Sequence, residues 1–132
     1  MYSVRLLLQM KVDCKRYLLW IVYIKLMFIC FEKNKEYYRR LFEITGQNSF
    51  GEFFAHYCEE TFFCILSRHP MKEMPCDLIT PQSLAHYNAL LLIEILKLWL
   101  SSTKDVPAEK IFEAYQYIMR TPILDMIQYP EI

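Results

Sequence analysis

Histidine and cysteine side chains carry most of the reactive chemistry in this sequence. His56 lies two residues before Cys58, and His69, Cys76 and His86 follow at longer intervals. A thiolate nucleophile needs a base beside it, but two residues at this separation point to different faces of a helix, and no third orienting group is evident. The same five residues lack the short ligand spacings of a structural zinc site. We therefore predict no catalytic site, no metal site and no cofactor.

The remaining reactive patterns also favour a protein that is not an enzyme. Glu59 and Glu60 are adjacent, so their carboxylates point apart on a helix and indicate a solvated face instead of an acid and base pair. The glycines, Gly46 and Gly51, are too few for a glycine-rich phosphate loop.

Ligand binding is the better functional hypothesis. Several side chains on expected helices would supply aromatic walls, polarizable sulfur and a few polar anchors around a cavity. The alternative is a close-packed core, because aromatic stripes at helical spacing are typical of cores. His86 and Asn88 are the most informative, because a polar side chain within an apolar run needs a partner. The candidate ligand-binding residues are Trp20, Tyr23, Met27, Phe54, Tyr57, Cys58, Phe62, Tyr87, Asn88 and Leu91.

The composition predicts one all-α domain spanning residues 1–132. Apolar residues make up 55% of the chain and aromatic residues 16%, with 2 glycines, which excludes disorder and disfavours a turn-rich β fold. The 15 basic and 15 acidic side chains cancel, so nothing draws this chain electrostatically to nucleic acid. The 5 cysteines are odd in number and mostly lie in apolar stretches. We expect them to be reduced core thiols in a cytoplasmic protein.

An apolar run over residues 17–31 resembles a membrane segment. It is shorter than the roughly 20 residues that a bilayer requires, and Lys25 lies in its middle. We therefore expect a buried helix and no membrane association.

Turn and cap residues divide the first half of the chain into helices. Residues 12–32 are compatible with one helix, and residues 1–10 fit a helix or a strand equally well. Asn34 is placed to cap a second helix over residues 35–43, after a kink, and this helix ends at Gly46.

A third helix begins at Ser49, which has the spacing of a capping box with Glu52, and it ends before Pro70. Its apolar side chains recur at three- and four-residue intervals, so we expect one face in the core. That face comprises Phe50, Phe53, Phe54, Tyr57, Cys58, Cys64 and Ile65.

Two further helices begin at prolines. Thr80 caps a helix over residues 81–100, and a second helix covers residues 107–119 until Thr121 and Pro122 stop it. We predict that these two helices form a hairpin. The tail, residues 123–132, is apolar enough to pack back onto the body.

The helix at residues 81–100 is apolar nearly all the way round. Such a helix must be buried on both sides, and a chain of 132 residues has few other helices to cover it, so a second copy is the natural cover. We therefore predict a homodimer. The predicted interface comprises Leu90, Ile93, Lys97, Trp99, Leu100, Ile111, Phe112, Tyr115, Ile118 and Met119.

Four segments follow one another in a familiar order. They are EKNKEYYRRLF (residues 32–42), NSFGEFFAHYCEETF (48–62), SLAHYNALLLIEILKLWL (83–100) and PAEKIFEAYQYI (107–118). Together they resemble the C-terminal regulatory domain of TetR/AcrR-type transcriptional regulators. The resemblance implies an all-helical effector-binding and dimerisation domain. Its last two long helices would pair with those of a second subunit as a four-helix bundle.

Members of this family place a helix-turn-helix before the regulatory domain. The residues before Tyr17 contain no glycine turn and no basic recognition helix, so we expect no operator binding by this chain alone. The expected function is to bind a small, largely apolar effector, or a partner protein, and to pass the bound state to a DNA-binding module. The alternatives are a helical interaction module without ligand that acts through mixed dimers, and a small membrane-anchored protein.

Overall fold

The computed structural model describes residues 17–46, 49–68 and 71–129, and these residues form helices and loops with no strand. The expected start of the first helix at residue 12, and residues 1–10, lie outside the described part. The α-helices are α2 (Tyr17–Glu32), α3 (Lys35–Glu43), α4 (Phe50–Ser67), α5 (Pro81–Ser101) and α6 (Ala108–Arg120), followed by a short 3-10 helix, η1 (Ile123–Met126). Every predicted helix is present, with its described ends within a few residues of those expected.

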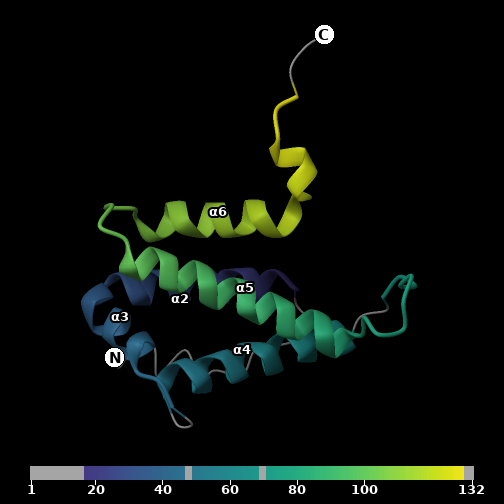
Figure 1. Cartoon of the computed structure of the whole chain (residues 1–132), viewed down its shortest axis with the longest axis horizontal. Helices are drawn as coiled ribbons and strands as arrows, with labels where there is room; N and C mark the ends of the chain where they lie inside the picture. Colours follow the sequence, from purple (N-terminus) through teal and green to yellow (C-terminus); the bar gives the residue numbers. More distant parts are fainter. Residues whose placement is uncertain (1–16, 47–48, 69–70, 130–132) are drawn as a thin grey trace.

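The helices pack as two pairs. α5 lies along α4, with α3 against both, while α6 packs most extensively against α2 (Figure 1). α5 and α6 are joined by a short loop, as the predicted hairpin requires, but α6 packs mainly against α2 and less against α5.

Local chemistry explains where α4 and α5 begin. The Ser49 hydroxyl accepts from the Glu52 amide at 3.2 Å, but the Ser49 amide already donates to the Gly46 carbonyl, so the predicted capping box is formed on one side only. Thr80 caps α5 with a complete capping box, because Thr80 and Ser83 each accept from the backbone N–H of the other.

The starts of α3 and α6 differ from the predictions in detail. Asn34 occupies the N-cap of α3 but makes no side-chain cap bond. Pro107 is the N-cap of α6 and not its first helical residue. The amide of Ala108 donates to the carboxylate of Glu32, at the end of α2, which anchors the positive end of the α6 dipole. Lys25 and Glu109 form a second link between α2 and α6, with 3.4 Å between Nζ and Oε1.

Aromatic rings fill the core in two groups. Phe31 lies 4.6 Å from Tyr38 and 5.6 Å from Phe54 between ring centroids, both edge to face, and Phe42 and Phe50 complete this group between α2, α3 and α4. The second group lies around Phe28, whose ring is 5.7 to 6.1 Å from those of Trp99, Phe112 and Tyr115.

The predicted core face of α4 is partly wrong. Phe54, Cys58 and Ile65 are buried as expected, but Phe53 is exposed. Phe62 is buried in its place. The buried stripe of α4 follows positions 54, 58, 62 and 65, so Phe53 lies one helical position outside it.

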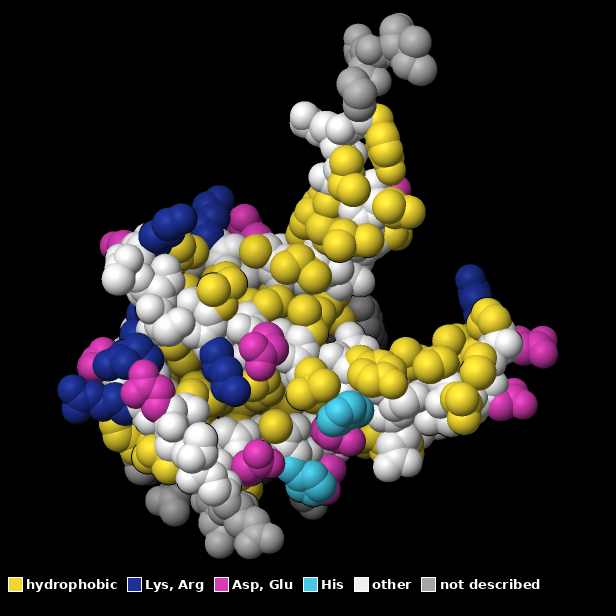
Figure 2. Space-filling view, viewed as in Figure 1, with side chains coloured by type: hydrophobic (Ala, Val, Ile, Leu, Met, Phe, Trp, Pro, Cys, Tyr) yellow, Lys and Arg dark blue, Asp and Glu magenta, His cyan; other side chains and the backbone are white. Residues whose placement is uncertain are grey.

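The predicted packing of the tail is wrong for residues 123–129, and residues 130–132 lie outside the described part. Thr121 and Pro122 adopt extended conformations, so the chain leaves α6 and projects from the body (Figure 1). Ile123 is 74% exposed and Leu124 is 63% exposed, and Ile127 and Tyr129 are exposed as well. Figure 2 shows the hydrophobic side chains gathered on this projecting segment.

The cysteines do not share one state. Cys30, Cys58 and Cys76 are free thiols, whereas Cys64 is disulfide-bonded. The expectation of reduced cysteines is therefore wrong for Cys64.

Among the described helices, α5 alone has the length and hydropathy of a membrane-crossing helix, and 39% of its most apolar window is buried in the fold. The apolar run over residues 17–31, which resembles a membrane segment in the sequence, forms α2, whose described length is 16 residues.

Candidate functional site

The predicted ligand-binding residues lie mostly in the packed core. Five of them are buried, three are half-buried, and Tyr87 is exposed, while the side chain of Trp20 lies outside the described part. The buried residues are Tyr23, Met27, Phe54, Cys58 and Phe62, and the half-buried residues are Tyr57, Asn88 and Leu91.

Polar side chains of this set form hydrogen bonds within the chain. The hydroxyls of Tyr23 and Tyr57 are 2.7 Å apart, and the side chain of Asn88 donates to the Leu84 carbonyl at 2.8 Å. Burial raises the pKa of Tyr23, and the hydrogen bond to Tyr57 raises it further. Burial also raises the pKa values of Tyr57 and Cys58. The Cys58 thiol is therefore protonated at neutral pH, which is the inert form of a cysteine.

The two described histidines, His56 and His86, pair with glutamates, whereas His69 lies outside the described residues. His86 on α5 lies 2.9 Å from Glu59 on α4, and His56 lies 3.0 Å from Glu60 in the next turn of its own helix. Within the described ranges, no three metal-ligating side chains lie close enough to share an ion. His86 thus has its partner on the neighbouring helix, which the sequence pattern did not predict.

A cleft of about 360 Å³ lies beside these histidines, between α4, α5 and the loop after α3. Glu52, Glu59 and Glu94 contribute carboxylates to its lining, and Lys97 contributes an ammonium. Phe42, Ile44, Ala55, Leu90 and Ile93 supply its apolar surface. Sequence reasoning missed this cleft because its two walls come from helices whose relative rotation no periodicity reveals.

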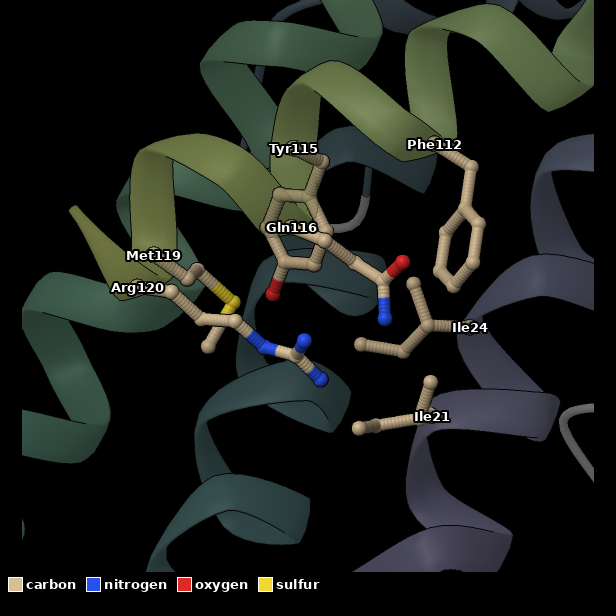
Figure 3. Close-up of a pocket in the computed structure, with 7 residues that line it drawn as sticks. All are labelled: Ile21, Ile24, Phe112, Tyr115, Gln116, Met119 and Arg120. Carbon is tan, nitrogen blue, oxygen red and sulfur yellow. The ribbon is translucent and has the colours of Figure 1, made fainter. Parts of the chain in front are cut away.

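A smaller cavity of about 70 Å³ lies between α2 and α6 (Figure 3). Ile21, Ile24, Phe112 and Met119 supply apolar walls, and Arg120 extends from the last turn of α6 toward α2. It is much smaller than the roughly 300–1,000 Å³ of typical small-molecule sites.

The residues predicted for a dimer interface divide into two groups. Five of them are covered by the same chain: Ile93, Trp99, Leu100, Phe112 and Tyr115. The other five are at least partly exposed: Leu90, Lys97, Ile111, Ile118 and Met119. Neighbouring Tyr87, Leu98 and Tyr117 are exposed too, with Leu98 at 69%. Hydrophobic side chains thus lie open to solvent on both α5 and α6 (Figure 2).

Comparison with known families decides the class of this protein. Residues 20–121 match the family of TetR-type transcriptional regulator C-terminal regions, and this match covers every α-helix from α2 to α6 nearly in full. The chain belongs to this family. The resemblance of the four sequence segments is thereby confirmed, as is the all-α fold.

Membership of the TetR C-terminal family also confirms that the chain is not an enzyme, because the family is a regulatory one. No curated protein and no solved structure matches the chain at a significant level.

Proposed function

We propose that this TetR-type region forms a homodimer through α5 and α6, and that it binds a small effector whose presence it passes to a DNA-binding module in the cytoplasm. The exposed apolar residues of α5 and α6 carry this proposal. Leu90 and Leu98 lie open to solvent on α5, and Tyr117, Ile118 and Met119 do so at the end of α6. Large apolar side chains left exposed on two neighbouring helices are typical of an association site.

The buried half of the predicted interface supports this surface from behind. Trp99 and Leu100 on α5 and Phe112 on α6 are packed inside the chain, so they hold the two helices in place. A dimer formed by the exposed residues would cover α5 on the side that α4 leaves open. The second copy would thus bury the apolar side of α5 that the helices of its own chain leave exposed.

Introducing a charge on this surface is expected to separate the dimer. Leu98→Asp places a carboxylate where the apolar side chain of a second copy would lie, so we expect the dimer Kd to rise by about 30-fold or more. Sedimentation velocity over a concentration series measures the change. The same substitution at Leu78, which is 82% exposed in the loop before α5, is the matched control and leaves the Kd unchanged. A wild-type protein that stays monomeric at high concentration contradicts the proposal.

We place the effector in the cleft between α4 and α5. Its volume of about 360 Å³ falls within the range of small-molecule sites, whereas half of the residues predicted from sequence are buried in the core. Its lining holds three carboxylates, one ammonium and the imidazoles of His56 and His86, and His86 already pairs with Glu59. The excess of carboxylates favours a largely apolar molecule with a cationic group. Leu90 and Lys97 line the cleft and also belong to the predicted interface, so a ligand there acts directly on the dimer.

Thermal shift measurements with lipophilic and cationic compounds test this placement. A compound that binds only the folded state raises the Tm, by an amount that grows with its concentration. Ala55→Phe fills the cleft and is expected to remove the shift, while Tyr57→Phe, which removes a hydroxyl from the packed core, is expected to keep it. The reverse pattern favours the core residues predicted from sequence.

The ligand-free interaction module makes a different prediction for the same experiment. A stable dimer that no compound stabilises supports that alternative, in which the chain acts through mixed dimers. Recovery of the protein only with detergent supports the membrane-anchored alternative.

A further inference from the structure

The segment after α6 is a second unpartnered apolar surface. We name residues 121–129 the C-terminal arm. Ile123, Leu124, Ile127 and Tyr129 are each more than half exposed, and the arm projects away from the body instead of covering it (Figures 1 and 2). Four large apolar side chains on nine residues are costly to leave in water, at up to about 1.5–3 kcal/mol each.

The cavity between α2 and α6 has complementary properties. At about 70 Å³ it is too small for a typical ligand but suits the end of one aliphatic side chain, and its walls are mostly apolar.

The charges of the arm and the cavity are also complementary. Asp125 carries the charge of the described arm, and Arg120 at the edge of the cavity is exposed. The arm begins directly after Arg120, and its extended first residues lead it away from its own cavity. A second copy related by a two-fold axis near the end of α6 would bring another arm to this cavity.

We propose that the C-terminal arms are exchanged between two copies of the chain, each arm docking between α2 and α6 of the partner, with Asp125 against Arg120. The exchange rests on the proposed dimer and adds a contact beyond the surface of α5 and α6. It is reciprocal, because a two-fold axis presents both arms and both cavities equally. It explains why the apolar side chains of the arm face solvent in a single chain.

Mixing two charge variants distinguishes exchange from folding back. In a D125R homodimer the introduced arginine faces Arg120, and in an R120E homodimer Asp125 faces the introduced glutamate. Each variant alone therefore brings like charges together. A heterodimer that exchanges arms pairs the new arginine with the new glutamate on one side and keeps Asp125 with Arg120 on the other. Native mass spectrometry of an equimolar mixture is expected to find heterodimers well above the statistical half. If each arm docks on its own chain, heterodimers make up only the statistical half of the dimers in the mixture.

A photo-crosslinker at Leu124 provides the second measurement. A chain carrying it is mixed with an isotope-labelled chain that does not. Crosslinks from the arm to labelled peptides containing Ile21 and Ile24, or Phe112 to Arg120, support the exchange. Crosslinks within one chain, including to residues 1–16, overturn it. Dimers with a statistical heterodimer fraction and no crosslink between chains overturn the exchange but leave the proposed dimer intact, whereas a monomeric wild type overturns both.

Discussion

Replacing Trp99 by alanine is expected to lower the free energy of unfolding by about 4 kcal/mol, because removal of a buried tryptophan side chain typically costs 3–5 kcal/mol. Only 2% of the Trp99 surface is exposed, so the change leaves a large cavity at the end of α5. Domains of this kind are stable by roughly 5–15 kcal/mol, so the loss removes a large share of the total.

The position of Trp99 explains the size of this effect. Its indole N–H donates to the Val106 carbonyl at 2.7 Å, in the loop before α6. The ammonium of Lys35 on α3 lies 4.8 Å from the ring centroid, and the ring of Phe28 on α2 lies 5.7 Å away. One side chain therefore contacts three elements besides its own helix.

Urea denaturation followed by circular dichroism measures the loss. Trp99→Phe is the matched control, because it keeps most of the apolar volume and removes the indole N–H. We expect it to cost about half as much as the alanine variant, mainly through the Val106 carbonyl left without its partner. Equal stability of the wild type and the alanine variant would show that Trp99 is not packed as described.

A second large effect is expected at alkaline pH. Cys58 is fully buried, and burial raises the pKa of its thiol in the folded state. In the unfolded chain the pKa of a cysteine is near 8.5, so above that pH the unfolded state loses a proton that the folded state retains. The stabilising contribution of the protonated thiol is complete below the unfolded pKa and is lost as pH rises toward the folded pKa. The free energy of unfolding should fall by about 1.4 kcal/mol per pH unit from this group alone.

Urea titrations from about pH 7.5 to 10.5 test this dependence. Cys58→Val keeps a buried apolar side chain and removes the proton, so its stability should fall less steeply than that of the wild type between about pH 9 and 10. Cys76→Val, at an exposed thiol, is the control and keeps the wild-type slope. Identical slopes for the Cys58 variant and the wild type would contradict a buried, protonated thiol.

Helix order and helix ends were predictable because their signals are local. Ser49, Thr80 and Pro81 act within one turn of their own positions, so no knowledge of the fold is needed to interpret them. The anchor of α6 was not predictable in this way. The carboxylate that accepts the hydrogen bond from the Ala108 amide belongs to Glu32, 76 residues earlier in the chain.

The candidate site was less predictable than the fold. Composition marked Tyr23, Met27 and Cys58 as possible cavity walls, but close packing and cavity lining require the same residue types. The cleft beside His86 depends on how α4 and α5 are rotated against each other, which is a tertiary property. The exposed tail illustrates the same limit of prediction. Its apolar sequence indicates that it should be buried, but it does not indicate which part of this chain or which other molecule buries it.

The link from Glu32 to Ala108 has a consequence for synthesis of the protein. α4 and α5 are neighbours along the chain and can associate as soon as both have left the ribosome, but α2 receives its main partner only when α6 emerges. Ile24 and Phe28, which lie against α6 in the folded chain, therefore remain uncovered by it during most of translation. Nascent chains with such a delay are prone to aggregate, so the growing polypeptide should depend on chaperones until its last helix is complete.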